Sequence, residues 1–94
     1  MTTTRSDIFE RVKSILKEEL FLSAEKTQNI TRLTNVCTDL GADDLDGVEV
    51  IIEFENQFGI SISEEECSPI LEEGGKNFTV GNCVDLLCQK LGIK

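Results

Sequence analysis

The sequence predicts an all-α fold, a small antiparallel four-helix bundle with three main helices, one short helix and a long first loop. Two observations lead to this prediction. Apolar residues recur at helical spacing in three segments, and capping residues bound each of these segments. The chain shows no hairpin signal and no internal repeat. With 94 residues it is expected to form one domain, residues 1–94.

The first main helix is expected over residues 7–20, with Ser6 as its N-cap. Its apolar residues fall on one stripe: Ile8, Val12, Ile15, Leu16 and Leu20. Residues 21–43 then lose the helical period, which predicts a long loop. Scattered apolar residues are expected to pin this loop to the core: Phe21, Leu22, Ile30, Leu33, Val36 and Leu40.

The second main helix is expected over residues 44–58, capped by Asp43 or Asp44 and ended by Gly59. Its core-facing residues are Ile51, Phe54 and Phe58. A single helical turn over residues 63–67 is predicted next, with Ser63 as its cap. Pro69 and the pair Gly74-Gly75 are expected to break regular structure after it. The last helix is expected to follow Thr79 as its cap and to stop at Gly92.

Composition narrows the classes of function. The chain has 18 acidic residues, nine basic residues and a formal charge of −9, and it contains no His, Trp or Tyr. These absences exclude a histidine general base, a histidine metal ligand and a stack of Trp and Tyr rings for single-stranded nucleic acid. The negative charge repels phosphate backbones. We therefore expect a docking or carrier module, and neither an enzyme nor a nucleic-acid-binding protein.

The charge is concentrated in the middle of the chain. Residues 33–75 hold 12 of the 18 acids and no Lys or Arg. One interpretation is a solvated acidic face that keeps the protein in solution. The other is a surface that attracts basic partners, since uncompensated charges repel one another and lower stability.

The four cysteines form no C-x-x-C pair and have no accompanying histidine, so no zinc site is expected. We expect each to serve as a small, partly buried apolar residue. The N-terminal sequence has no apolar signal-peptide core, and no run approaches 18 apolar residues. The sequence thus predicts a cytoplasmic protein, a monomer, with reduced thiols and no membrane span.

The densest motif is DLGADDLDGVEV, residues 39–50. Calcium binding is one reading, because the EF-hand spacing can be laid on Asp44, Asp46, Gly47 and Glu53. The first ligand position would then be Ala42, which has no side-chain oxygen. The helical period also begins at Leu45, inside the supposed loop. An EF-hand is therefore not expected, and weak divalent binding to Asp43, Asp46 and nearby Glu residues stays open.

A family resemblance is the second reading. The segment DLGADDLDGVEVIIEFENQFGISISEE resembles the acyl carrier proteins of fatty-acid and related synthesis, whose signature is D-L-G-x-D-S-L followed by a helix with a V-E-L/V pattern. The resemblance extends to IFERVKSILKEEL and to FTVGNCVDLLCQKL, and departs at CSPILEEGGKN, which is longer than the usual connection. It implies a non-enzymatic carrier of acyl intermediates in fatty-acid, lipid or polyketide biosynthesis.

The resemblance also implies an attachment position. In the family, the serine of D-S-L carries 4′-phosphopantetheine, and the matching residue here is Asp44. A carboxylate cannot form the stable phosphodiester that a hydroxyl forms, so the chain as written should not be loaded. Asp44 is either native, in a pseudo-carrier that docks without loading, or an introduced Ser→Asp change. A third reading makes Asp44 only a helix cap.

A docking face is implied at the second main helix. In the family this helix meets basic patches on synthases, reductases, transferases and the phosphopantetheinyl transferase. The matching positions here are Leu45, Asp46, Val48, Glu49, Ile52, Glu55 and Asn56. Core packing is the alternative for Val48 and Ile52, and Gly47 is expected to loosen the first turn. An alternative function is a non-carrier interaction or regulatory protein that keeps only this face.

Overall fold

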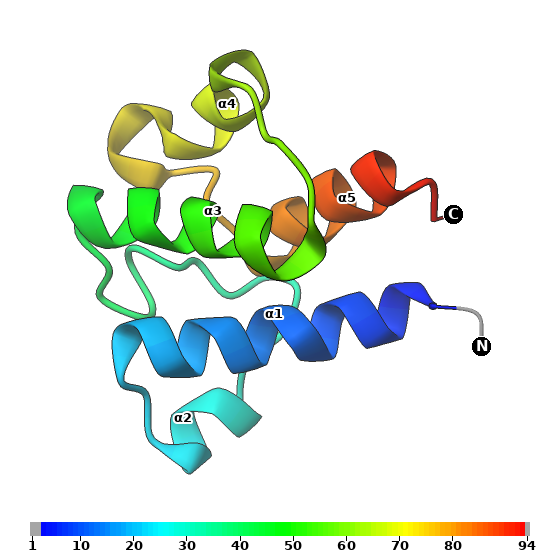
Figure 1. The fold of residues 1–94 in the computed structure, drawn as a ribbon. Helices are drawn as coiled ribbons and strands as arrows, with labels where there is room; N and C mark the ends of the chain where they lie inside the picture. The colour runs from blue at the N-terminus through cyan, green and yellow to red at the C-terminus, as the bar shows by residue number, and fades with distance from the viewer. Residues whose placement is uncertain (1–2, 94) are drawn as a thin grey trace.

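The computed structural model describes residues 3–93 and is all-helical over that range, with one isolated β-bridge between Asn35 and Thr79. The helices are α1 (Arg5–Leu20), α2 (Ala24–Gln28), α3 (Asp44–Phe58), α4 (Glu64–Gly75) and α5 (Val80–Leu91). Helix α1 packs against α3 and α5 and runs opposite to both, while α4 lies on α3 away from α1 (Figure 1). The predicted antiparallel helical bundle is confirmed.

Helix α1 begins two residues earlier than predicted, and Ser6 is not its cap. The Asp7 N–H donates to Thr4 Oγ1 (3.2 Å), and the Thr4 N–H donates to Asp7 Oδ2 (2.9 Å). This reciprocal pair satisfies two backbone donors, which a single serine cap would not do. The helix buries four of the five predicted apolar residues, namely Ile8, Val12, Ile15 and Leu16.

The prediction of one unbroken loop over residues 21–43 is wrong in part. Ser23 caps the five-residue helix α2, its Oγ accepting the Lys26 N–H at 3.1 Å. Such a short helix has too few residues for an apolar period to show. Ile30, Val36 and Leu40 pin the loop to the core as expected, whereas Phe21 and Leu33 are 94% and 86% exposed.

Helix α3 has its predicted bounds and ends at Gly59, which is left-handed (φ 64°). Val50, Ile51 and Phe54 are buried, and Phe58 is half-buried. Helix α4 is longer than the predicted turn. Ser63 is its cap as expected, but Pro69 lies inside the helix, which continues to Ile70 and Leu71 at the core. Regular geometry stops at Glu72.

Helix α5 begins after Thr79 and ends at Gly92, as predicted. It adds Val84, Leu87 and two cysteines to the core that surrounds Phe54 and Phe78. Cys83 and Cys88 are buried and Cys37 and Cys67 half-buried, and all four are free thiols, in agreement with the prediction of small apolar side chains. Burial raises the pKa of the Cys83 thiol to about 12.

Candidate functional site

The site begins where the motif DLGADDLDGVEV enters α3. Asp43 is the N-cap: the Asp46 N–H donates to Asp43 Oδ1 (2.8 Å), and the Asp43 N–H donates to Asp46 Oδ2 (3.2 Å). Asp44 is the first helical residue, is exposed, and takes no part in this capping pair. The reading of Asp44 as only a helix cap is therefore wrong, because the cap is already supplied by its neighbour.

A cavity of about 290 Å³ opens beside Asp44. Its walls come from the first loop, the start of α3, the end of α4 and the segment before α5, and its lining is Cys37, Asp43, Asp44, Gly47, Val48, Leu71, Gly74, Gly75 and Phe78. No lining residue carries a hydroxyl group.

Gly47 has a packing role that its sequence position does not reveal. A Cβ at this residue would lie 3.0 Å from Phe78 Cε2 and 3.5 Å from Leu71 Cδ2. Such contacts are tighter than ordinary van der Waals separation for the Phe78 ring, which is fully buried. The glycine therefore lets the Phe78 ring pack closely against the start of α3 at the cavity. This contact opposes the loosening of the first turn that the sequence predicts for Gly47.

Asn35 holds two walls of this cavity together. It is 8% exposed, and its Nδ2 donates to the carbonyls of Gly75 (2.9 Å) and Lys76 (3.1 Å). Its Oδ1 accepts the N–H groups of Cys37 (2.8 Å) and Thr38 (2.9 Å). The side-chain amide of Asn35 thus uses both its donor nitrogen and its acceptor oxygen. Its hydrogen bonds fix the first loop against the end of α4. Sequence reasoning missed Asn35 because an asparagine in a polar loop carries no signal of burial.

Cys37 forms a wall of the cavity and is half-buried. Burial, followed by the negative charges of Asp44 and Asp43, raises the pKa of its thiol. Since the thiolate is the nucleophile, a raised pKa lowers the fraction of the reactive form. Gly75 faces this sulfur with a left-handed backbone (φ 80°), and a Cβ there would collide with Cys37 Sγ.

Of the seven predicted docking residues of α3, the five exposed ones are spaced to lie along one side of the helix. Leu45, Val48 and Ile52 are 67%, 44% and 48% exposed, so core packing does not account for Val48 and Ile52. Glu49 and Asn56 are also exposed. The two remaining acids are half-buried and have partners within the chain: Asp46 in the capping pair, and Glu55, whose Oε2 accepts the Ile62 N–H at 2.8 Å.

The acidic surface continues from α3 onto the end of α1. Burial raises the pKa of Glu19, and the charges of Glu53, Glu49 and Glu18 raise it further. Within residues 3–93, no group of three or more His, Cys, Asp or Glu side chains could hold a metal ion. The EF-hand reading also fails on backbone geometry, because Asp44 to Glu53 form a helix and not a loop.

Comparison with known proteins decides the family. The chain is 35% identical over 89 residues to the acyl carrier protein of Thermotoga maritima, an alignment that covers 95% of this chain and 98% of that protein. The chain belongs to the acyl carrier protein family. No protein-family model matches it.

Membership in the acyl carrier protein family gives the chain a carrier-like role in biosynthesis, and makes it a non-enzymatic protein. Proteins of this family normally carry 4′-phosphopantetheine. Asp44, the residue expected at the attachment position, is among the residues that line the cavity described above. Across residues 3–93, no helix is both long enough and apolar enough to cross a bilayer.

Proposed function

We propose that this acyl carrier protein-like chain docks on acyl-processing enzymes without being loaded with 4′-phosphopantetheine. One observation carries the proposal: Asp44 presents an exposed carboxylate, outside the capping pair, at the first position of α3. Loading requires a hydroxyl at that position, and the cavity beside it is lined by none.

The chemistry of the attachment distinguishes a serine hydroxyl from the carboxylate of Asp44. A phosphopantetheinyl transferase joins the phosphate of coenzyme A to a serine oxygen, which gives a stable phosphodiester. The same transfer to the Asp44 carboxylate would give an acyl phosphate, a mixed anhydride that water cleaves readily. Thr38 is exposed in the first loop but is not among the residues that line the cavity. The chain therefore lacks an acceptor for the group at this site.

Docking through α3 is supported by the exposed face described above. Leu45, Val48 and Ile52 offer apolar contact area, while Glu49 and its acidic neighbours attract basic surfaces on the partner. Charges of this kind raise the rate of association more than the affinity. The partners we propose are synthases, reductases, transferases and the phosphopantetheinyl transferase itself. We further propose that the chain acts as a monomer in the cytoplasm, where its four free thiols stay reduced.

The test is incubation with a phosphopantetheinyl transferase and coenzyme A, followed by intact-mass measurement. The unaltered chain should gain no mass, and Asp44→Ser should gain one phosphopantetheine group. Asp43→Ser is the matched control: it places a hydroxyl one residue away, keeps a good capping residue, and should stay unmodified.

Each other outcome has a definite meaning. A phosphopantetheine gain on the unaltered chain would overturn the proposal. If Asp44→Ser stays unmodified while remaining folded, the face that the transferase recognises has diverged. That outcome would favour the alternative, a non-carrier interaction or regulatory protein that keeps only the docking face.

A further inference from the structure

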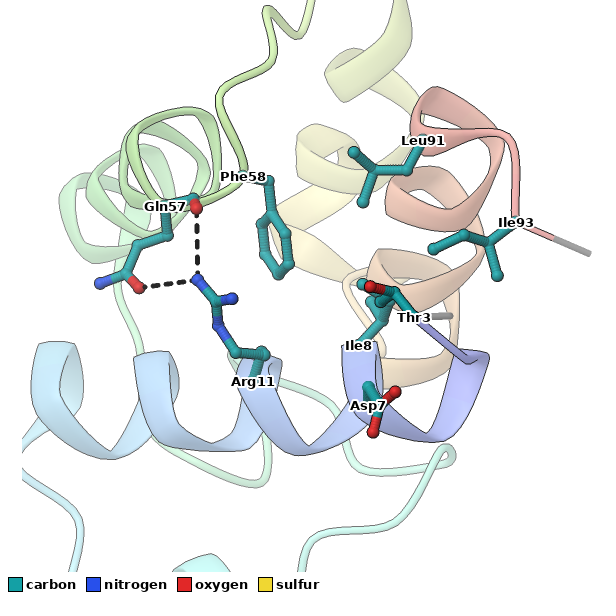
Figure 2. A pocket seen from close by; sticks show the side chains of 8 residues that line it. All are labelled: Thr3, Asp7, Ile8, Arg11, Gln57, Phe58, Leu91 and Ile93. Atoms are coloured by element: carbon teal, nitrogen blue, oxygen red, sulfur yellow. Dashed lines mark hydrogen bonds between the residues drawn. The ribbon is translucent and has the colours of Figure 1, made fainter. Parts of the chain in front are cut away.

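A second and larger cavity, of about 740 Å³, lies at the opposite end of α3. It is bounded by the start of α1, the end of α3 and the end of α5, and Figure 2 shows its lining of Thr3, Asp7, Ile8, Arg11, Gln57, Phe58, Leu91 and Ile93. Its volume is in the range of small-molecule sites, about 300–1,000 Å³. Helix α3 has 15 residues, and at about 1.5 Å per residue it sets this cavity roughly 20 Å from Asp44.

Arg11 supplies the positively charged group of this cavity. Its Nη2 donates to the Gln57 carbonyl and to Gln57 Oε1, both at 3.2 Å, and its guanidinium carbon lies 4.9 Å from the centre of the Phe58 ring. Gln57 is itself held, because its Nε2 donates to Glu53 Oε1 at 2.9 Å. The guanidinium is thus positioned by neutral oxygens and by an aromatic face.

The charge of Arg11 has no carboxylate partner among residues 3–93. The basic side chains that do form ion pairs over this range are Arg5, Lys13, Arg32, Lys76 and Lys90. The hydrogen bonds of Arg11 within the described chain use Nη2 alone, so Nε and Nη1 keep three N–H donors for a ligand. A planar guanidinium with spare donors matches a carboxylate in geometry and in charge.

The remaining walls are mainly apolar. Ile8 is buried, Phe58 and Ile93 are half-buried, and Leu91 is 36% exposed. In Figure 2 the Phe58 ring lies between Arg11 and the pair Leu91 and Ile93, while the Asp7 carboxylate points away from the ring. Asp7 already accepts the Thr4 N–H. An anionic head at Arg11 would therefore have apolar surface directly beside it for a tail.

We propose that this cavity binds a medium-chain fatty acid without a covalent bond, its carboxylate on Arg11 and its alkyl tail along Phe58, Leu91 and Ile93. A monoanion fits better than a phosphate, because the chain carries a net charge of −9 and each further negative charge adds repulsion. The inference goes beyond the proposed function, since it needs neither loading at Asp44 nor docking through α3.

The experiment is a titration of isotope-labelled protein with sodium decanoate, followed by NMR at constant ionic strength and below the concentration at which decanoate forms micelles. Saturable shifts are expected at Ile8, Phe58, Leu91 and Ile93. Arg11→Met keeps an apolar stem and should weaken decanoate binding about tenfold, the size of a charge-assisted hydrogen bond. Decanol, which has no charge, should bind both proteins within about twofold of each other.

Lys17→Met is the matched control, because it removes the same charge from an exposed position on the same helix, outside the cavity. Its affinity for decanoate should stay within about twofold of the unaltered chain. Equal losses in Arg11→Met and Lys17→Met would overturn the proposal, since they would show a general effect of charge. Shifts confined to Gly47, Leu71 and Gly75 would also overturn it, by placing the tail in the cavity beside Asp44.

If Arg11→Met does not fold, Arg11→Lys carries the test. Lysine keeps the charge but loses the planar fork, so decanoate affinity should fall while decanol affinity stays constant. Unchanged decanoate affinity in a folded Arg11→Lys, together with no shift at Phe58, would overturn the proposal. The titration uses the unmodified chain, so a failed transferase experiment at Asp44 would leave its result unaffected.

Discussion

The two ends of α3 are built in different ways. At the Asp44 end, the walls of a cavity of about 290 Å³ are tied together by the amide of Asn35, which bonds to both of them. At the Phe58 end, the cavity of about 740 Å³ is shaped by packing of helix ends around the single guanidinium of Arg11. One end depends on a buried neutral side chain, and the other on one charged side chain near the surface.

This difference has a physical consequence. A buried amide that satisfies four backbone groups is costly to remove, because each partner left unpaired keeps its desolvation penalty. Contacts of a charged side chain near the surface are worth less, and salt screens them. We therefore expect the Asp44 end to be sensitive to substitution, and the Phe58 end to be sensitive to solution conditions.

The largest effect is expected from Asn35→Ala. The substitution leaves the carbonyls of Gly75 and Lys76 and the N–H groups of Cys37 and Thr38 without this partner, and we expect unfolding free energy to fall by about 4 kcal/mol. Urea denaturation of the unaltered chain and the variant measures this loss of unfolding free energy.

The matched control for this loss is Asn82→Ala. Asn82 Nδ2 also donates to a backbone carbonyl, that of Asn77 at 2.7 Å, but this bond is exposed. We expect a loss of less than about 1 kcal/mol. Equal losses at Asn35 and Asn82 would show that the buried amide does not hold the walls together.

The next largest loss of stability is expected at the end of α4, where two adjacent glycines can be compared. Both are left-handed, with φ of 68° at Gly74 and 80° at Gly75, but only Gly75 lacks room for a Cβ, which would collide with Cys37. Gly74→Ala should cost about 1 kcal/mol from backbone strain. Gly75→Ala should cost about 3 kcal/mol, because overpacking is added.

Thermal or urea unfolding of both glycine variants measures this difference. In the double variant Gly75→Ala/Cys37→Ala, part of the additional loss should be recovered, since the clash partner is gone. A Gly75→Ala protein as stable as Gly74→Ala would contradict the close approach of the loop to this glycine.

The sequence was sufficient for the features that depend on local pattern. The apolar period predicts α1, α3 and α5, and Gly59 and Gly92 end two of them as expected. The motif around Asp44 was also located from sequence, because its residues are contiguous. The sequence does not predict α2, since five residues hold no apolar period. It predicts only the first turn of α4, because Pro69 is expected to break regular structure.

The parts of the site that the sequence did not reveal depend on contacts between distant segments. Asn35 bonds to carbonyls 40 and 41 residues away, and Gly47 is needed because Phe78 packs on it. The cavity at Arg11 joins both ends of the chain to the end of α3. No local pattern encodes such distances, so only the fold brings these residues together.

Beyond the Phe58 end, the pair Glu66 and Lys90 gives a pH test. The Ser63 N–H donates to Glu66 Oε1 (2.9 Å), and Lys90 Nζ donates to the same oxygen (2.9 Å). The backbone bond from Ser63, and then Lys90, lower the pKa of Glu66 to about 2. A lowered pKa stabilises the fold above the ordinary value near 4.5, and this contribution is lost as pH falls toward 2.

The measurement is unfolding free energy against pH between about 2 and 4.5, the window set by the two pKa values of Glu66. In the unaltered chain the free energy should fall as pH is lowered through this window. Glu66→Gln should flatten the slope, while Glu64→Gln, in the same helical turn but outside this pair, should keep it. Equal slopes in all three proteins would show that Glu66 is not the source of the pH dependence.

The smallest effect has the opposite sign and lies toward the Asp44 end. Burial and the charges of Glu53, Glu49 and Glu18 raise the pKa of Glu19, so its folded form binds a proton more strongly than its unfolded form. Stability from this group is present at low pH and is lost as pH rises through the raised pKa. Glu19→Gln should therefore stabilise the protein at pH 7, by about 0.3 kcal/mol at low salt.

Because salt screens like-charge repulsion, this gain should shrink at about 1 M salt, where the screening length is near 3 Å. Glu25→Gln, the same charge change in α2, is the control and should change stability less at either salt concentration. A gain equal in both variants would reflect the net charge of −9 alone. A gain confined to Glu19 would show that the acidic face of α3 lowers the stability of the end of the bundle that bears Asp44.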